Sequence, residues 1–160
     1  MFRTPLTLFR TLALAEAVSW TILIAGIIVR NTAGLPIAVT IGGGIHGFVF
    51  LSYAAAAILV AKNQRWGAGP AALAVISSIV PYATVPTEVW LHRRGRLAGA
   101  WRLTATDDPR DRVWHDRLMR RMLRAPWLFA LLLVAAIAVV YVALLVFVPV
   151  PHGGTSALAR

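Results

Sequence analysis

Four long apolar segments divide the chain, separated by short or strongly basic stretches. They cover about residues 6–29, 37–61, 70–91 and 127–148. A helix needs roughly 20 apolar residues to cross a hydrocarbon core about 30 Å thick. Each segment meets that length, so the sequence predicts an all-α integral membrane protein with four transmembrane helices.

Few polar or helix-breaking residues interrupt the apolar segments. The first contains Arg10 and Glu16, the second contains His46, and the third contains Pro81 and Glu88. The small residues of "LALAEA" resemble a signal-peptide cleavage site, but the apolar run continues well past them and Arg10 breaks the expected apolar region. We therefore expect the first segment to be a transmembrane helix and not a signal peptide that is removed.

The hydrophilic stretch 92–125 predicts an amphipathic helix that lies in the membrane interface. Its start is marked by Asp107-Asp108-Pro109, a capping carboxylate followed by proline in the first turn. Apolar side chains then recur every four residues while arginines cover the remaining surface, a pattern that places the arginine heads among anionic lipid headgroups. A soluble helix packed on a partner is the alternative. The predicted headgroup contacts are Arg110, Trp114, Arg117, Arg120, Arg121 and Arg124.

Composition supports a membrane protein and narrows its chemistry. The chain is 59% hydrophobic and 14% charged, whereas soluble domains have about 25% charged residues. It has no cysteine, which excludes disulfides and thiolate metal sites. The net charge of +10 comes without a nucleic-acid-binding fold or an aromatic stacking platform. We therefore expect no nucleic-acid partner and assign the basic residues to orientation and to anionic lipid.

Basic residues also predict the orientation. With four spans, one side receives Arg30 and the ten arginines of the long loop, and the other side receives Arg3, Arg10, Lys62, Arg65 and Arg160. Cytoplasmic loops carry an excess of Lys and Arg. We therefore predict that loop 92–126 is cytoplasmic and both termini are outside, although Arg3 and Arg10 favour the opposite. The preference for Arg and Ala suggests a bacterial genome of high G+C content, and we expect the chain in the bacterial plasma membrane.

A polar layer is predicted near the middle of the membrane. With 1.5 Å of rise per residue, the depths of Glu16 and His46 differ by only about 6 Å. Ser77 and Ser78 lie close to the depth of Glu16, and ionisable groups in hydrocarbon normally face the bundle interior. The predicted intramembrane site is Glu16, His46, Ser77 and Ser78. Three interpretations remain open: a hydrogen-bonded latch that fixes helix register, a site that binds or relays a proton or small ligand, or groups that do not face each other.

Helix packing is predicted from three further positions. Gly43 and Gly47 form a small-xxx-small pair that lets two helices approach closely. Pro81 interrupts the third segment by removing the hydrogen bond to the carbonyl of Ser77.

Cofactors and catalysis are not indicated by the sequence. Haem would need a second axial ligand, and no other histidine lies at mid-membrane depth. Serine-hydrolase, zinc-protease, P-loop and dinucleotide motifs are also absent from the sequence. We therefore predict a non-enzymatic protein without a metal or cofactor.

Three motifs resemble a known family. They are "RTLALAEAVSW" (10–20), "GGIHGFVFLSY" (43–53) and "SSIVPYAT" (77–84). In this order they resemble the bacterial integral membrane family described as domain of unknown function 3817, over about residues 6–97. His46-Gly47 matches its most specific mark and Glu16 matches its early Glu, while Ala83 replaces the glycine of its usual Pro-aromatic-Gly-Thr run. The resemblance implies a three-helix membrane module, occasionally fused to transporter domains, with no established activity.

The predicted organisation and function follow. Residues 6–97 form the three-helix module, 98–125 the Arg-rich loop, 126–149 the fourth span and 150–160 a flexible tail. We expect a membrane module that forms a homo-oligomer or joins a larger membrane complex, with Glu16 and His46 as a polar latch. The alternative is a small-solute or proton transport component that uses the same two residues.

Overall fold

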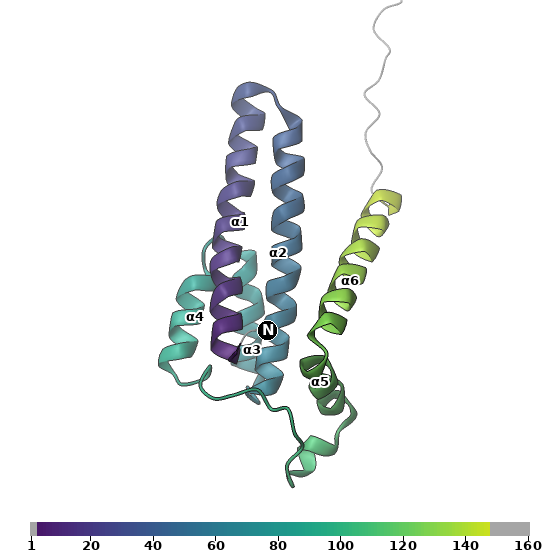
Figure 1. Ribbon diagram of the computed structural model, residues 1–160. Helices are drawn as coiled ribbons and strands as arrows, with labels where there is room; N and C mark the ends of the chain where they lie inside the picture. Colours follow the sequence, from purple (N-terminus) through teal and green to yellow (C-terminus); the bar gives the residue numbers. More distant parts are fainter. Residues whose placement is uncertain (1–2, 148–160) are drawn as a thin grey trace, which may run out of the picture.

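The computed structural model describes residues 3–147, which form helices and loops without a strand in that range. Helices α1 (Pro5–Ala33) and α2 (Pro36–Asn63) make a long antiparallel hairpin (Figure 1). Within the described residues, these two helices are long and apolar enough to cross a membrane. The expectation of an all-α fold is therefore met for these residues, and α1 and α2 correspond to the first two predicted spans.

Local sequence sets both ends of α1. Thr4 caps its first turn: the Thr4 side chain accepts a hydrogen bond from the Thr7 backbone at 3.2 Å, and the Thr7 side chain bonds back to the Thr4 backbone. At the other end Gly34 adopts a left-handed conformation with φ 67°, which ends the helix without steric cost. Pro36 then occupies the first turn of α2, where a missing backbone N–H does no harm.

The third apolar segment is not one helix, so the prediction of a single span over 70–91 is wrong. It divides into α3 (Ala68–Ile76), the 3-10 turn η1 (Ser77–Ile79) and α4 (Thr84–Arg93). Proline disfavours the helical conformation of the residue before it, and Val80 is extended at φ −101°, ψ 125°. Tyr82 then takes a left-handed φ of 64°, which reverses the chain. Ala83 keeps a helical φ of −68°, so the turn does not depend on glycine there.

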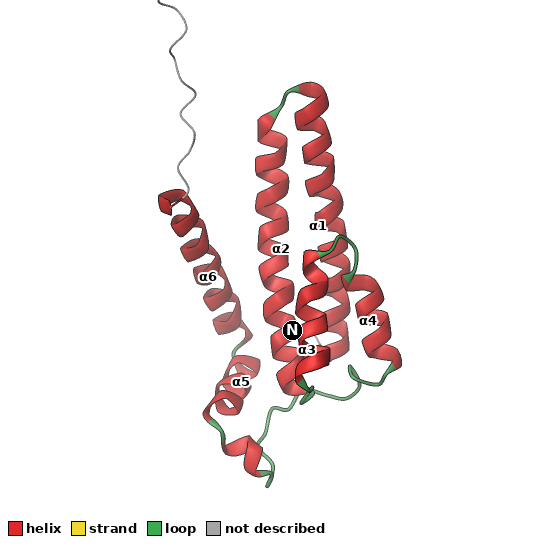
Figure 2. Ribbon diagram, turned by 180° about the vertical axis from the view of Figure 1, so that it is seen from behind, coloured by secondary structure: helices red, strands yellow, loops and turns green. Residues whose placement is uncertain are grey.

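The two short helices form a hairpin that returns to the end of the bundle from which it started (Figure 2). Directly after α3, the hydroxyl of Ser77 in η1 lies 3.3 Å from the Tyr53 hydroxyl of α2. Along α4, the Thr84 hydroxyl donates to the Ala13 carbonyl of α1 at 3.0 Å. Further on, Glu88 pairs with Arg10 at 2.9 Å, near the start of α1. The chain has therefore travelled back down α1 by the time α4 ends.

This arrangement corrects the predicted topology. The start of α1, the end of α2 and both ends of the α3–α4 hairpin lie at one end of the bundle, together with residues 94–125 (Figure 1). We call it the basic end. Four complete spans would place the beginning of α1 and the long loop at opposite ends of the bundle, whereas the structure places them at the same end.

The apolar core lies near the basic end, where the α3–α4 hairpin packs on α1 and α2. The Phe9 ring lies 5.4 Å from the Tyr53 ring and 6.1 Å from the Trp66 ring. Beyond the hairpin, α1 and α2 pack mainly on each other, and Ile28 and Ile37 are exposed. The buried core cluster consists of Phe9, Ala13, Tyr53, Ala57, Val60, Ala74, Leu91 and Leu97.

The last part of the described chain consists of one 3-10 turn and two helices. The predicted helix from Asp108 is divided into the 3-10 turn η2 (Pro109–Arg112) and α5 (Trp114–Arg124), because Val113 between them is extended, with ψ 143°. Helix α6 (Pro126–Phe147) then runs beside α2 toward the opposite end (Figures 1 and 2). Its 22 residues measure about 33 Å along the axis. The predicted tail, 150–160, lies outside the described residues.

Candidate functional site

The structure brings Glu16 and His46 together through a residue that the sequence analysis missed. The Ser19 hydroxyl lies 3.1 Å from Glu16 Oε2 and 3.0 Å from His46 Nδ1. Glu16 Oε2 and His46 Nδ1 are themselves 3.8 Å apart. If His46 donates its Nδ1 proton to Ser19 Oγ, the Ser19 hydroxyl can donate in turn to Glu16, which links α2 to α1 by a chain of two hydrogen bonds.

Helical spacing explains why this site forms. Glu16 and Ser19 are three residues apart and therefore share one face of α1, where both side chains are buried. Aromatic rings close the site around the histidine: the Trp20 ring lies 4.3 Å from the His46 ring, and the Phe50 ring lies 6.1 Å away. The polar groups are thus enclosed by apolar surface, which strengthens hydrogen bonds between them.

The tip of the α3–α4 hairpin packs against α1 at the level of Glu16. Thr84 bonds to the Ala13 carbonyl below this residue, and the Tyr82 hydroxyl lies 3.3 Å from the Thr21 hydroxyl above it. Glu16 is consequently fully buried. Its Oε1 atom has no hydrogen-bond partner within the described residues, so the carboxyl group keeps unused acceptor capacity.

Ser77 and Ser78 form no hydrogen bond to the other predicted polar residues within the described part of the chain. The Ser77 hydroxyl donates to the Ala74 carbonyl at 2.8 Å and lies near Tyr53, while the Ser78 hydroxyl donates to the Val75 carbonyl at 2.7 Å. These bonds satisfy carbonyls where α3 ends. Depth along a helix was a sufficient guide for Glu16 and His46, but it did not reveal which way the serines face.

Close helix packing involves different glycines from those predicted. A Cβ on Gly26 would lie 2.6 Å from the Ala38 carbonyl oxygen, and one on Gly42 would lie 3.1 Å from the Ile22 carbonyl oxygen. Between the polar site and the loop that joins the two helices, Gly26 and Gly42 thus bring α1 and α2 into close contact. At Gly43 and Gly47 a Cβ would meet nothing within 4 Å. Pro81 is exposed in the hairpin tip, where it ends a helix.

A second polar cluster holds the loop at the basic end. The buried Asp111 carboxylate accepts hydrogen bonds from the Thr106 hydroxyl and backbone at 2.7 and 2.8 Å, and from Arg65 and Arg102 at 2.9 Å each. These bonds, those from Thr106 foremost, hold the pKa of Asp111 well below its usual range. Asp111 therefore remains ionised and ties the end of α2 to the loop.

This cluster changes the role of two predicted headgroup contacts. Arg120 is buried, and its guanidinium donates to the Asp111 carbonyl at 2.5 Å. Arg124 donates twice to the Leu103 carbonyl, at 2.8 and 3.1 Å. Both arginines thus contribute to the internal structure of the basic end, because each donates to a backbone carbonyl of the loop.

The exposed surface of α5 keeps part of the predicted amphipathic pattern. Trp114 and Leu118 are exposed, as are Arg117 and Arg121. The side chain of Arg110 lies outside the described part of the structure. The buried face of α5 consists of Asp116, Met119, Arg120 and Leu123.

Two apolar helices of membrane length, with the buried Glu16 near His46 at their contact, are typical of a helical membrane protein. A family model described as "Domain of unknown function (DUF3817)" matches residues 6–93, more than half of the chain. The chain belongs to this family, which confirms the resemblance noted for residues 6–97. The match includes Glu16, Ser19, His46 and the α3–α4 hairpin.

Two relatives are named as membrane proteins. A protein of Streptomyces coelicolor, named "Putative membrane protein SCO5905", is 32% identical over 91 residues, which cover 56% of this chain but 11% of the relative. A Bacillus subtilis protein, named "Uncharacterized membrane protein YdzA", is 32% identical over 83 residues, which cover 51% of this chain and 86% of the relative. No solved structure matches the chain.

Proposed function

We propose that the chain is a non-enzymatic integral membrane module of the bacterial plasma membrane, which assembles with itself or with a larger membrane complex. The observation that carries the proposal is the Ser19 hydroxyl between Glu16 and His46. All three groups belong to α1 and α2, neighbouring helices of one chain. Hydrogen bonds between buried polar groups fix the register of packed membrane helices, so these residues act as a latch.

The orientation follows from the charges at the basic end. That end carries fourteen of the sixteen Lys and Arg, while among the described residues Arg30 lies at the other end. By the positive-inside rule the basic end is cytoplasmic. In this topology α1, α2 and α6 cross the membrane, and the α3–α4 hairpin enters it and returns. Arg3 and Arg10 opposed the orientation expected for four spans. In this topology they lie on the same side of the membrane as the basic loop.

The proposed participation in larger assemblies draws on one relative and on the surface of α6. The segment similar to this chain makes up 11% of the Streptomyces coelicolor protein, so a module of this kind occurs within a much longer chain. Helix α6 also presents exposed apolar side chains such as Leu131 and Val139. These can contact lipid or a neighbouring membrane helix.

A labelling experiment tests the proposed orientation. Since the chain has no cysteine, single cysteines can be introduced at Leu35, at Thr104 and before Met1. A membrane-impermeant maleimide applied to intact cells should modify the Leu35 position only, and the other two should react after permeabilisation. Labelling of the Thr104 position in intact cells would reject a cytoplasmic basic end.

A transport component that uses Glu16 and His46 is the second candidate, and the buried, unpartnered Glu16 Oε1 favours it. Proteoliposomes with an imposed pH gradient separate the two functions. A latch predicts that the purified chain dissipates the gradient no faster than empty liposomes do. A proton flux that the wild type carries and that both Glu16→Gln and His46→Gln abolish would support a proton relay instead of a latch.

A further inference from the structure

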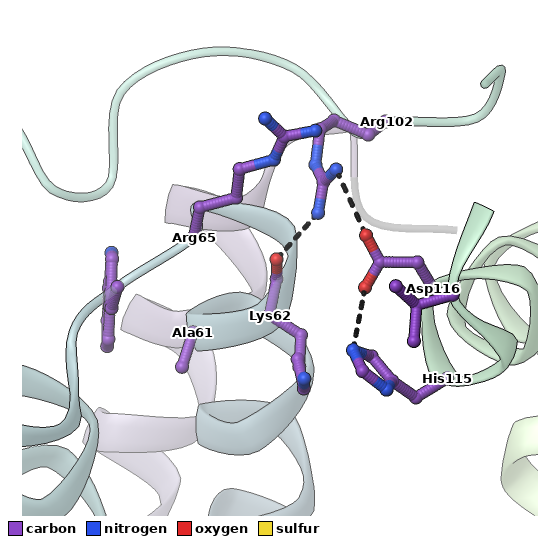
Figure 3. A pocket seen from close by; sticks show the side chains of 8 residues that line it. Ala61, Lys62, Arg65, Arg102, His115 and Asp116 are labelled. Atoms are coloured by element: carbon purple, nitrogen blue, oxygen red, sulfur yellow. Dashed lines mark hydrogen bonds and ion pairs between the residues drawn. The ribbon is translucent and has the colours of Figure 1, made fainter. Parts of the chain in front are cut away.

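Two adjoining hollows lie between α2 and the loop–α5 region at the basic end. The first has a volume of about 270 Å³, and we call it the polar hollow because charged side chains stand among the apolar ones of its lining (Figure 3). The second has a volume of about 320 Å³ and an almost entirely apolar lining. Lys62 and His115 line both. The two hollows thus form one continuous surface that changes from polar to apolar at these two side chains.

One cation that lines the polar hollow has no ion-pair partner within the described residues. Arg65 is paired with Asp108 and Asp111, and Arg102 with Asp111 and Asp116. Asp116 also lies 3.6 Å from His115. The Lys62 ammonium group makes no ion pair within the described residues, although its backbone carbonyl accepts a bond from Arg102 at 2.7 Å. Lys62 is therefore the cation available to bind an external anion.

The apolar hollow leads from this charge along α2. Its α2 residues run from Lys62 back to Ala55, two turns of helix or about 10 Å toward the interior of the bundle. The facing wall comes from α5. Besides the two shared residues, the lining consists of Ala55, Ile58, Leu59, Leu118, Met119 and Met122.

We propose that these hollows bind one anionic phospholipid. Its phosphate contacts Lys62 and His115, and the upper part of one acyl chain lies in the apolar hollow between α2 and α5. A cation at the membrane surface attracts anionic lipid, and the adjoining apolar surface gains free energy when an acyl chain covers it. A small soluble phosphate would leave that surface uncovered. The proposal rests on the membrane insertion proposed above and adds the ligand class and the residues that recognise it.

Native mass spectrometry of the full chain in neutral detergent tests the proposal, with phosphatidylglycerol and phosphatidylcholine as the added lipids. Wild type should bind one phosphatidylglycerol in preference to phosphatidylcholine. Lys62→Gln should weaken this binding about fivefold, since one cation near a membrane surface contributes about 1 kcal/mol. His115→Gln should weaken it as well. The matched control is Arg117→Gln, which removes an exposed charge from α5 outside both hollows and should leave the affinity unchanged.

Three results would overturn the lipid site. Equal binding of both lipids would mean that the net negative charge of the headgroup is not recognised. If Arg117→Gln lowers the affinity for phosphatidylglycerol as much as Lys62→Gln does, the lipid is attracted by the overall charge of the basic end and not by a defined site. Full competition by glycerol 3-phosphate, which has no acyl chain, would mean a soluble-phosphate site. The lipid titration is made in detergent, so its result does not depend on the orientation in cells or on proton flux. A failure of the lipid site can therefore be distinguished from a failure of the proposed function.

Discussion

Replacement of Gly26 by alanine should separate α1 from α2, whereas the same replacement at Gly43 should not. The new methyl group at position 26 would lie 2.6 Å from the Ala38 carbonyl oxygen and 3.0 Å from its carbon. These are backbone atoms and cannot rotate away as a side chain can. At position 43 the methyl group would meet nothing within 4 Å.

The two effects have opposite signs and can be estimated. Overpacking a close contact costs about 1–3 kcal/mol, while alanine is better than glycine in a helix by roughly 0.5–1 kcal/mol. We therefore expect Gly26→Ala to be destabilised by as much as about 2 kcal/mol and Gly43→Ala to be stabilised by up to about 1 kcal/mol. Thermal unfolding in detergent, followed by circular dichroism, should show a lower midpoint for Gly26→Ala and an unchanged or higher one for Gly43→Ala.

Equal midpoints for wild type and Gly26→Ala would refute the close approach of α1 and α2. A clear loss of stability in Gly43→Ala would have a different meaning. Because this position is open within the chain, such a loss would show that the stripe of Gly43 and Gly47 packs against another chain, as a homo-oligomer requires.

Three further predictions concern the hairpin and the basic end. Tyr82→Val should lower the unfolding midpoint more than Tyr82→Gly, since a β-branched residue tolerates the left-handed φ of 64° poorly. Arg10→Gln should cost about 1–3 kcal/mol by leaving the buried Glu88 carboxyl unpaired, whereas Arg3→Gln, an exposed control, should cost little in the same melts. Asp111→Asn should destabilise the chain at neutral pH. Because folding lowers the pKa of Asp111, its contribution is present above the ordinary carboxyl range and declines as pH falls below it, so the difference from wild type in pH-dependent melts should shrink under acid.

The sequence predicted the helices and the Glu16–His46 neighbourhood because both depend on local rules. Apolar length marks a membrane helix, and a fixed rise per residue gives the depth of each polar group in an antiparallel pair. Ser19 escaped notice because serine is common in apolar segments. Its position three residues after Glu16 was nevertheless a usable signal, since that spacing places both on one face.

The hairpin and the role of Arg120 depend on how separate elements pack against each other. The hydropathy of 70–91 is that of a span, and Pro81 predicts an interruption, but neither reveals that Tyr82 reverses the direction. Likewise, the helical pattern of α5 places Arg120 on a polar surface. Only the fold brings it to Asp111, on the other side of Val113.

The most direct test of the latch is a double-mutant cycle on Glu16 and His46, measured as stability in detergent. The variants are Glu16→Leu, His46→Leu and the double substitution, and a parallel cycle pairs Glu16→Leu with Ser77→Ala, whose hydroxyl contacts Tyr53 instead. Coupled groups show interaction energies of about 0.5–3 kcal/mol. The latch predicts that the double Glu16–His46 variant loses less stability than the sum of its single variants, while the Ser77 cycle is additive. Strict additivity between Glu16 and His46 would contradict it.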